Sequence, residues 1–238
     1  FSRRPSTVIA IMIQFSINSK ELKSKLEVSG KFVSKNPAVP VLENFWFVIK
    51  DKVLSITGGD GQNFISTHLP IACTEDLELC VPADKLRSLL SKLPVQEIQF
   101  SYNTTVGDTK IFPPIPDTFI LYMQHFSGEY ELTCEDPVYY IKPPVVKDPK
   151  VFSLEREFIK HCSDASKFVP IENYSKFPYT LVRFKGGTLS SVGCDGSNML
   201  QITKPFNHEQ DLDLYFAPKT VQTLNSILEA DVVMEYNN

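Results

Sequence analysis

The sequence lacks three features that would have narrowed its function. No stretch of its 238 residues approaches the run of about 20 apolar residues that a membrane span needs. Arg3 and Arg4 precede a short apolar run, but it is too short for an export signal and has no small-residue cleavage site. Positive charge is not in excess, since the net charge is −4, so the chain as a whole has no electrostatic reason to bind nucleic acid. We therefore expect a cytoplasmic protein without a membrane segment.

Cysteine and histidine are few and scattered. No C-x-x-C pair occurs, which excludes a zinc knuckle and a dense disulfide framework. No two histidines have the i, i+4 spacing of a metal site, and none has an evident Ser or Cys partner. We expect reduced, mostly buried thiols, no metal and no cofactor. The residues concerned are Cys73, Cys80, Cys134, Cys162 and Cys194, and His68, His125, His161 and His208.

An internal repeat organises what is present. Apolar residues make up 42% of the chain, a globular composition, and the length exceeds that of one average domain. Five short segments of the first half recur in the same order in the second half, at an offset that drifts only from 137 to 134 residues. We therefore expect two similar domains. The pairs are Ile13–Ile17 with Lys150–Leu154, Lys31–Val33 with Lys167–Val169, Leu54-Ser55 and Asp60-Gly61 with Leu189-Ser190 and Asp195-Gly196, Asp76–Leu79 with Asp211–Leu214, and Ile98–Asn103 with Val232–Asn237.

Each repeat is predicted to contain a strand, a helix, several strands, a second helix and a strand. Asn18 followed by Glu21 resembles a capping box, which predicts that the first helix begins there. Pro82 precedes a leucine-rich second helix, and Pro94 ends it. Two helices packed on one side of antiparallel sheet define an α+β fold.

Six short motifs stand out in the two repeats: Ile13–Ile17, Pro37–Asn44, Leu54–Asp60, Val81-Pro82-Ala83, Gly128–Leu132 and Val192–Gly196. These motifs resemble those of the bacterial-type DNA sliding clamp, the DNA polymerase III beta subunit family. The resemblance covers nearly all of residues 12–238 and implies the DNA-clamp fold. It implies a non-catalytic processivity factor that encircles duplex DNA as a ring and tethers a polymerase.

The resemblance also divides the chain. Residues 12–148 correspond to a first clamp-like domain, residues 149–238 to a second, and residues 1–11 to an N-terminal extension ahead of Met12, the plausible start. Asn238 is the counterpart of about Asn103, so we expect the closing strands of the second domain to be absent. The third domain of bacterial clamps, which with the second forms the pocket for polymerase peptides, has no counterpart here. The implied partners are DNA, a polymerase and a clamp loader, in a homotrimeric ring if the protein has two domains or a dimeric ring if it has three.

Two positions depart from the family pattern. Family members usually continue from the Asp-Gly of the middle domain into His-Arg, where this chain has Ser197 and Asn198. Asn36, beside Lys35, stands where the family commonly has a basic residue ahead of a P-x-x-P motif. Both changes remove a basic side chain that would attract phosphate.

Positive charge is concentrated on the four predicted helices. Taken as residues 19–31, 84–92, 155–167 and 219–229, they hold 11 Lys or Arg against 7 Asp or Glu, a net +4, which leaves −8 elsewhere. Exposed helices often carry such residues for solvation alone, but their recurrence on all four helices, together with the resemblance, favours DNA. The candidate DNA-binding residues are Lys20, Lys23, Lys31, Lys35, Arg87, Lys92, Arg156, Lys160, Lys167 and Lys219.

Two other functions compete with the clamp. A protein-interaction scaffold with the clamp fold that no longer encircles DNA is compatible with the changes at Asn36, Ser197 and Asn198. An enzyme using Asp60 and Asp195 as paired carboxylates is disfavoured, because their recurrence at equivalent repeat positions predicts a structural turn instead.

Overall fold

The structure is a computed structural model that describes residues 13–33, 35–73, 75–105, 107, 116–170, 178–206 and 211–236. The chain forms two compact units that divide between Pro143 and Pro144. The domain boundary expected between residues 148 and 149 lies in the connector that follows, just ahead of β9 (Lys150–Leu154). The expected N-terminal extension, residues 1–11, lies outside the described residues.

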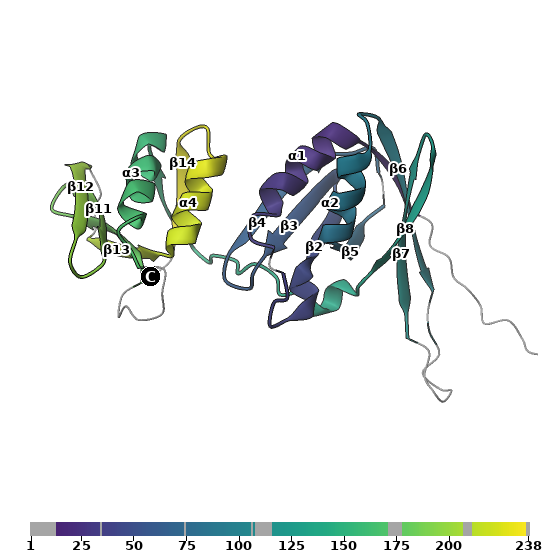
Figure 1. Cartoon of the computed structure of the whole chain (residues 1–238), viewed down its shortest axis with the longest axis horizontal. Helices are drawn as coiled ribbons and strands as arrows, with labels where there is room; N and C mark the ends of the chain where they lie inside the picture. Colours follow the sequence, from purple (N-terminus) through teal and green to yellow (C-terminus); the bar gives the residue numbers. More distant parts are fainter. Residues whose placement is uncertain are drawn as a thin grey trace, which may run out of the picture. The chain divides into compact units, whose positions relative to one another are not determined.

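Unit 1, the described residues up to Pro143, combines two four-stranded antiparallel sheets with two α-helices. The strand orders are β1-β6-β7-β8 and β4-β3-β2-β5, and a bridge between Cys80 and Glu135 joins β5 to the end of β8. Helices α1 (Ser19–Ser29) and α2 (Ala83–Lys92) lie side by side over the second sheet (Figure 1). The strands are β1 (Ile13–Asn18), β2 (Asn44–Lys50), β3 (Val53–Gly59), β4 (Phe64–Pro70), β5 (Leu77–Pro82), β6 (Glu97–Thr105), β7 (Thr118–His125) and β8 (Gly128–Cys134), with short 3-10 helices η1 (Pro40–Glu43) and η2 (Pro137–Tyr139).

Unit 2, the described residues from Pro144 onward, repeats the element order of unit 1 from β1 to β6. Its sheets have the orders β12-β11-β10-β13 and β14-β9, and its helices α3 (Arg156–Ser166) and α4 (Pro218–Ile227) pack together. The expected α+β architecture of repeated domains, each with two helices on antiparallel sheet, is confirmed. The remaining strands are β10 (Thr180–Lys185), β11 (Thr188–Cys194), β12 (Met199–Pro205), β13 (Leu212–Phe216) and β14 (Val232–Tyr236).

Local sequence explains where the elements of unit 1 begin and end. In β1, Phe15 is buried while its neighbours Gln14 and Ser16 are exposed, the period of a strand with one buried face. The Asn18 side chain accepts a hydrogen bond from the Lys20 backbone N–H at 3.0 Å, which caps α1 as the sequence predicted. The second helix ends at Lys92, two residues before Pro94, also as predicted.

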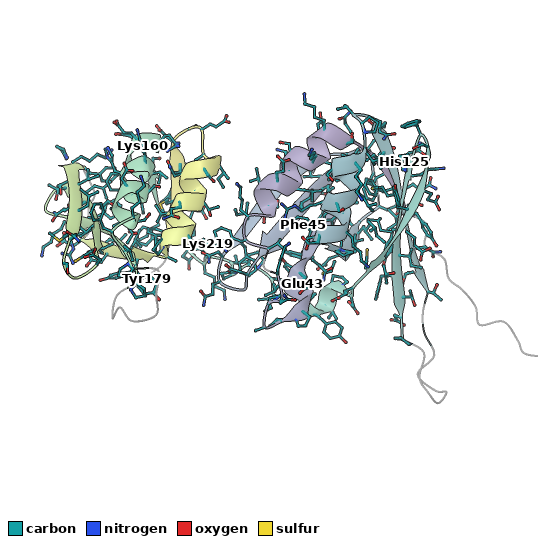
Figure 2. The ribbon with its side chains drawn as sticks, viewed as in Figure 1. Glu43, Phe45, His125, Lys160, Tyr179 and Lys219 are labelled. Carbon is teal, nitrogen blue, oxygen red and sulfur yellow. The ribbon has the colours of Figure 1, made fainter. Side chains whose placement is uncertain are left out.

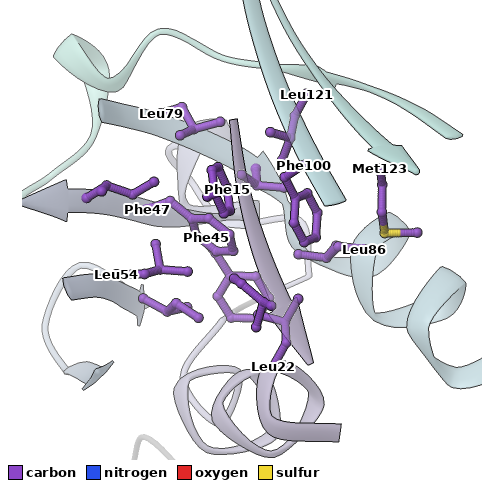
Figure 3. Close-up of a cluster of buried hydrophobic side chains, with 14 of the residues drawn as sticks. Phe15, Leu22, Phe45, Phe47, Leu54, Leu79, Leu86, Phe100, Leu121 and Met123 are labelled. Atoms are coloured by element: carbon purple, nitrogen blue, oxygen red, sulfur yellow. The ribbon is translucent and has the colours of Figure 1, made fainter. Parts of the chain in front are cut away.

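The core of unit 1 lies between its helices and both sheets. Phe45 and Phe47 are completely buried (Phe45 is labelled in Figure 2), whereas Trp46 between them lies on the opposite face and stacks on Tyr140 at 5.5 Å. Figure 3 shows Leu22 of α1 and Leu86 of α2 reaching the same cluster as the aromatic rings of the strands. The expectation that consecutive aromatic residues alternate between faces is met, so these rings do not form a base-stacking platform.

Both Asp-Gly pairs of the repeat form the same turn. The Asp60 carboxylate accepts hydrogen bonds from the backbone N–H groups of Gln62 and Asn63. Asp195 accepts the equivalent pair from Ser197 and Asn198, and the glycine that follows each aspartate has φ near +93°, at +92° and +94°. The turn occupies each carboxylate within its own unit, which confirms the structural interpretation and argues against paired catalytic carboxylates.

The thiols follow the expected pattern with one exception. Cys73, Cys80, Cys134 and Cys162 are buried and unpaired, and Cys194 is exposed. Burial raises the pKa of Cys80 and Cys134 to about 12 and that of Cys162 to about 11, so these groups are protonated and inert at neutral pH. Among the described residues, no helix is long and apolar enough to span a membrane.

Candidate nucleic-acid interface

Unit 1 carries six of the ten candidate basic residues, four of them on its two α-helices. Lys20 and Lys23 are exposed on α1, whereas Leu22 and Leu26 of the same helix are buried. The hydrogen bond from Ser19 Oγ at the start of α1 to the Pro94 carbonyl beyond α2 shows that the two helices run antiparallel. Lys31, which follows α1, and Lys92, which ends α2, are exposed as well.

A groove of about 420 Å³ between α1 and α2 brings together Lys23, Lys35 and Arg87. The Arg87 guanidinium lies beside Gly30, the C-cap of α1, where the negative end of the helix dipole favours a cation. Lys35 is 3.7 Å from the Asp84 carboxylate, but both side chains are highly exposed, so solvent weakens this ion pair. The groove wall is therefore cationic, with partly compensating acids.

Unit 2 has fewer exposed candidate cations than unit 1. Lys160 on α3 and Lys219 near the start of α4 are exposed (Figure 2). Lys167, the C-cap of α3, donates a hydrogen bond to the Asp164 carboxylate at 2.8 Å, which lowers the pKa of Asp164. Because this pair is close to neutral as a whole, Lys167 attracts phosphate less than an isolated lysine would.

Arg156 differs from the other candidates. Its guanidinium donates hydrogen bonds to Asn225 and Leu228 at the end of α4, and the residue is half-buried. Sequence analysis named Arg156 as a candidate DNA-binding residue, a role that needs a guanidinium available to phosphate. The reason for the difference is tertiary, since its partners lie about 70 residues further along the chain.

With the observed helix boundaries, positive charge is concentrated in unit 1. Helices α1 and α2 hold six basic and three acidic residues, a net +3, whereas α3 and α4 hold three and two, a net +1. Sequence reasoning left out Lys85, an exposed residue of α2 that lines a second hollow with Arg87 and Lys35. A helical wheel drawn from the Leu86 and Leu90 stripe would have found it.

The two positions that depart from the family pattern have structural uses. Asn36 has φ +53°, a left-handed conformation that asparagine tolerates better than most residues, and its N–H donates to the Glu43 carboxylate at 3.0 Å. The Asn198 side chain donates to the Asp195 carboxylate at 3.1 Å and so completes the Asp-Gly turn. Neither position presents a cation.

The positive charge of the site is suited to binding a polyanion. Its side chains are exposed Lys and Arg, and side chains of this kind can contact phosphate oxygens. In the part of the chain that the structure describes, no three His, Cys, Asp or Glu side chains form a group that could hold a metal ion. Among the described histidines, His68 bonds to Ser55 and His125 stacks on Tyr130.

Comparison with known proteins identifies the fold. Residues 13–111 match the family model of the DNA polymerase III beta subunit, N-terminal domain. A beta sliding clamp of Halalkalibacterium halodurans is 23% identical over 215 residues, which are 84% of this chain and 53% of that protein, so the chain spans about half the length of this relative. The sliding clamp of Bacillus subtilis superposes with a TM-score of 0.80 at 14% identity, over 94% of this chain and 59% of that one.

A second solved structure agrees. The beta subunit from DNA polymerase of Streptococcus pyogenes has a TM-score of 0.81 at 17% identity, over 94% of this chain and 60% of that one. The likeness extends across both units, beyond the residues that the family model matches. Residues 13–111 therefore resemble the DNA polymerase III beta subunit, N-terminal domain, and the chain has the fold of the bacterial-type sliding clamps.

Proposed function

We propose that this chain acts in a DNA sliding clamp, a non-catalytic processivity factor that encircles duplex DNA and tethers a DNA polymerase. The observation that carries the proposal is the recurrence of exposed basic residues on the helix pairs of two units that share the clamp fold. A clamp must hold a polyanion while sliding along it, which requires phosphate contacts from mobile, hydrated cations and no base-specific contacts. The helices of this chain provide such contacts.

In this proposal the two units are the clamp-like domains of residues 12–148 and 149–238, in a cytoplasmic protein. Their helices line the hole of a homo-oligomeric ring, and a polymerase and a clamp loader are the protein partners. The contact set is Lys20, Lys23, Lys31, Lys35, Lys85, Arg87, Lys92, Lys160, Lys167 and Lys219. Arg156 is left out, because α4 occupies its guanidinium.

The free edge of β8 is the surface we propose for subunit contact in the ring. β8 ends its sheet, and Gly128, Glu129 and Tyr130 at its beginning are exposed together with Phe126. An exposed strand edge with aromatic side chains is suited to pairing with another chain. Sizing of the protein at micromolar concentration checks the ring, because a stable monomer would contradict it.

Retention on closed DNA tests the function directly. The protein, its clamp loader and ATP are incubated with nicked circular plasmid, and bound protein is separated from free protein by gel filtration. We expect coelution with the circular DNA and release once a restriction enzyme linearises it, because a ring slides off an open end. Equal retention on linear and circular DNA would contradict encirclement, and no retention on either would favour the scaffold.

The contact residues are tested in the same assay. The double variant Lys160→Glu, Lys167→Glu reverses two charges on the proposed inner surface, and we expect it to reduce loading. Lys185→Glu is the matched control, since Lys185 is an exposed lysine at the end of β10, on the face away from α3. Normal loading of the double variant would reject the assignment of these two lysines.

A further inference from the structure

Hydrogen bonds from one residue, Arg156, link the start of α3 to the end of α4 and the residues after it. The Arg156 Nε donates a hydrogen bond to the Leu228 carbonyl at 2.7 Å, and its two Nη atoms donate to the Asn225 side-chain and backbone oxygens at 2.8 Å each. The Arg156 backbone N–H donates to the Asp231 carboxylate at 2.8 Å. A single residue thus makes four hydrogen bonds to a segment about 70 residues away.

These hydrogen bonds satisfy backbone groups at two helix ends that have no partner within their own helix. The last carbonyls of a helix have no partner within it, and the Leu228 and Asn225 carbonyls belong to the last turn and C-cap of α4. The guanidinium supplies donors to both and places a positive charge at the negative end of the helix dipole. At the start of α3, the Glu155 side chain makes no capping bond, and Asp231 accepts the orphan N–H instead.

Unit 1 has an equivalent joint, meaning hydrogen bonds from the first residue of its first helix to the segment after its second helix, but a different residue makes it. Ser19 corresponds to Arg156 in the internal repeat and likewise begins the first helix of its unit. Its backbone N–H donates to the Gln96 carbonyl at 2.8 Å, and its hydroxyl bonds to the Pro94 carbonyl and the Gln96 N–H. Ser19 is only 5% exposed and carries no charge, so the joint does not depend on contact with a ligand.

We propose that Arg156 is a positioning residue that fixes the α3–α4 pair, rather than a residue that contacts phosphate. Through this joint it sets the relative placement of Lys160 on α3 and Lys219 on α4. The role of Lys160 and Lys219 in DNA contact rests on the proposed clamp function, whereas the hydrogen bonds from Arg156 to α4 do not depend on it. The fork of three directed donors is the property that matters, because lysine offers a similar charge without this geometry.

Amide hydrogen exchange of the whole chain tests the joint without DNA. In Arg156→Gln we expect faster exchange confined to residues 156–158 and 225–231, well below the melting temperature. Arg156→Lys should exchange like Arg156→Gln, because its ammonium cannot bridge Asn225 and Leu228. The control Val221→Ala removes methyl groups from the core of unit 2 and should accelerate exchange broadly across that unit. Wild-type exchange in Arg156→Gln, rescue by lysine, or a broad pattern like that of Val221→Ala would overturn the proposal.

The salt dependence of binding to a short duplex separates positioning from phosphate contact. Loss of one phosphate contact lowers the slope of log K against log salt concentration by about 0.9. We expect this loss in Lys160→Gln and an unchanged slope in Arg156→Gln, with Arg183→Gln as a control for removing an arginine from the outer face. A slope loss in Arg156→Gln equal to that of Lys160→Gln would overturn the proposal. The clamp function itself fails if the wild-type chain is not retained on circular DNA in the loading assay, and hydrogen exchange alone then decides the role of Arg156.

Discussion

At the scale of single residues, equivalent hairpin turns of the two units differ in how well their residues suit the backbone. Gly186 and Gly187 between β10 and β11 have φ values of +57° and +73°, and the Gly-Gly pair predicts this turn from sequence. Asp51 and Lys52 between β2 and β3 adopt the same left-handed conformation, at +51° and +62°. Side chains with a Cβ are disfavoured there, so the turn of unit 1 is strained where that of unit 2 is not.

Replacing Lys52 by glycine relieves this strain. We expect Lys52→Gly to raise the free energy of unfolding by about 1 kcal/mol, measured by urea denaturation. The control Gly187→Ala should lower the free energy of unfolding by a similar amount. The cause would be the positive φ alone, because a Cβ at Gly187 would meet no atom within 4 Å. A destabilised Lys52→Gly variant would show that the lysine side chain has a role that outweighs its conformational cost.

The Asp195 turn is sensitive to acid. Hydrogen bonds from the backbone N–H groups of Asn198 and Ser197 stabilise the charged carboxylate and lower its pKa below the ordinary 3.8. A depressed folded-state pKa adds stability that is present above pH 3.8 and is lost as the pH falls through the lower folded value. Carboxyl ¹³C NMR titration should show this low pKa, and Asn198→Ala, which removes the side-chain donor, should raise it. An ordinary Asp195 pKa in the wild type would contradict the turn geometry.

At the scale of elements, a glycine in the third strand of each unit lets a helix approach the sheet. A Cβ added at Gly58 of β3 would lie 2.2 Å from the Ser29 carbonyl oxygen at the end of α1. At Gly193 of β11 it would lie 1.8 Å from the Ala165 carbonyl oxygen of α3. The repeat preserves this contact, although the flanking Thr57 and Val192 differ.

Alanine at these positions should force each helix away from its sheet. We expect Gly58→Ala and Gly193→Ala each to cost about 1 to 3 kcal/mol of unfolding free energy, as overpacked cores do. Gly128→Ala is the matched control, because its added Cβ would come no closer than 3.7 Å to the His125 ring. If all three variants were equally stable, the helices would have room to shift, and close approach would not be a constraint.

Elements were easier to predict from sequence than the contacts between them. The spacing of apolar residues and the residues at the helix ends located the helices, because Asn18 and Pro94 act on residues next to them in the chain. The close approach at Gly193 and the fastening of Arg156 to Asn225 depend on residues far apart in the chain, which no local pattern encodes. A comparison of the equivalent repeat positions Ser19 and Arg156 is the sequence signal that would have pointed to a shared role.

At the scale of the whole molecule, net charge conceals the charge distribution. The chain is −4 overall, while the nine basic and five acidic residues of its four α-helices give those helices +4. Sequence analysis predicted the same total, and the structure places +3 of it on α1 and α2 and +1 on α3 and α4. In unit 2 the Arg156 guanidinium is hydrogen-bonded to α4 and Lys167 is paired with Asp164, so the cations available to a ligand lie mainly in unit 1.

If DNA binds to the helix charges, two variants that each lose three positive charges should differ in DNA binding according to where those charges were. The triple variant Lys23→Gln, Arg87→Gln, Lys92→Gln removes three exposed cations from α1 and α2, and we expect the salt slope of duplex binding to fall by about 2.7. The control triple variant, Lys50→Gln, Lys147→Gln, Lys185→Gln, removes three exposed cations from a strand, the connector and a hairpin. Its slope should stay at the wild-type value, because phosphates held along the helices do not reach those side chains. Equal losses in the two variants would mean that DNA responds to the overall charge of the chain, and the helix surface would lose its assignment.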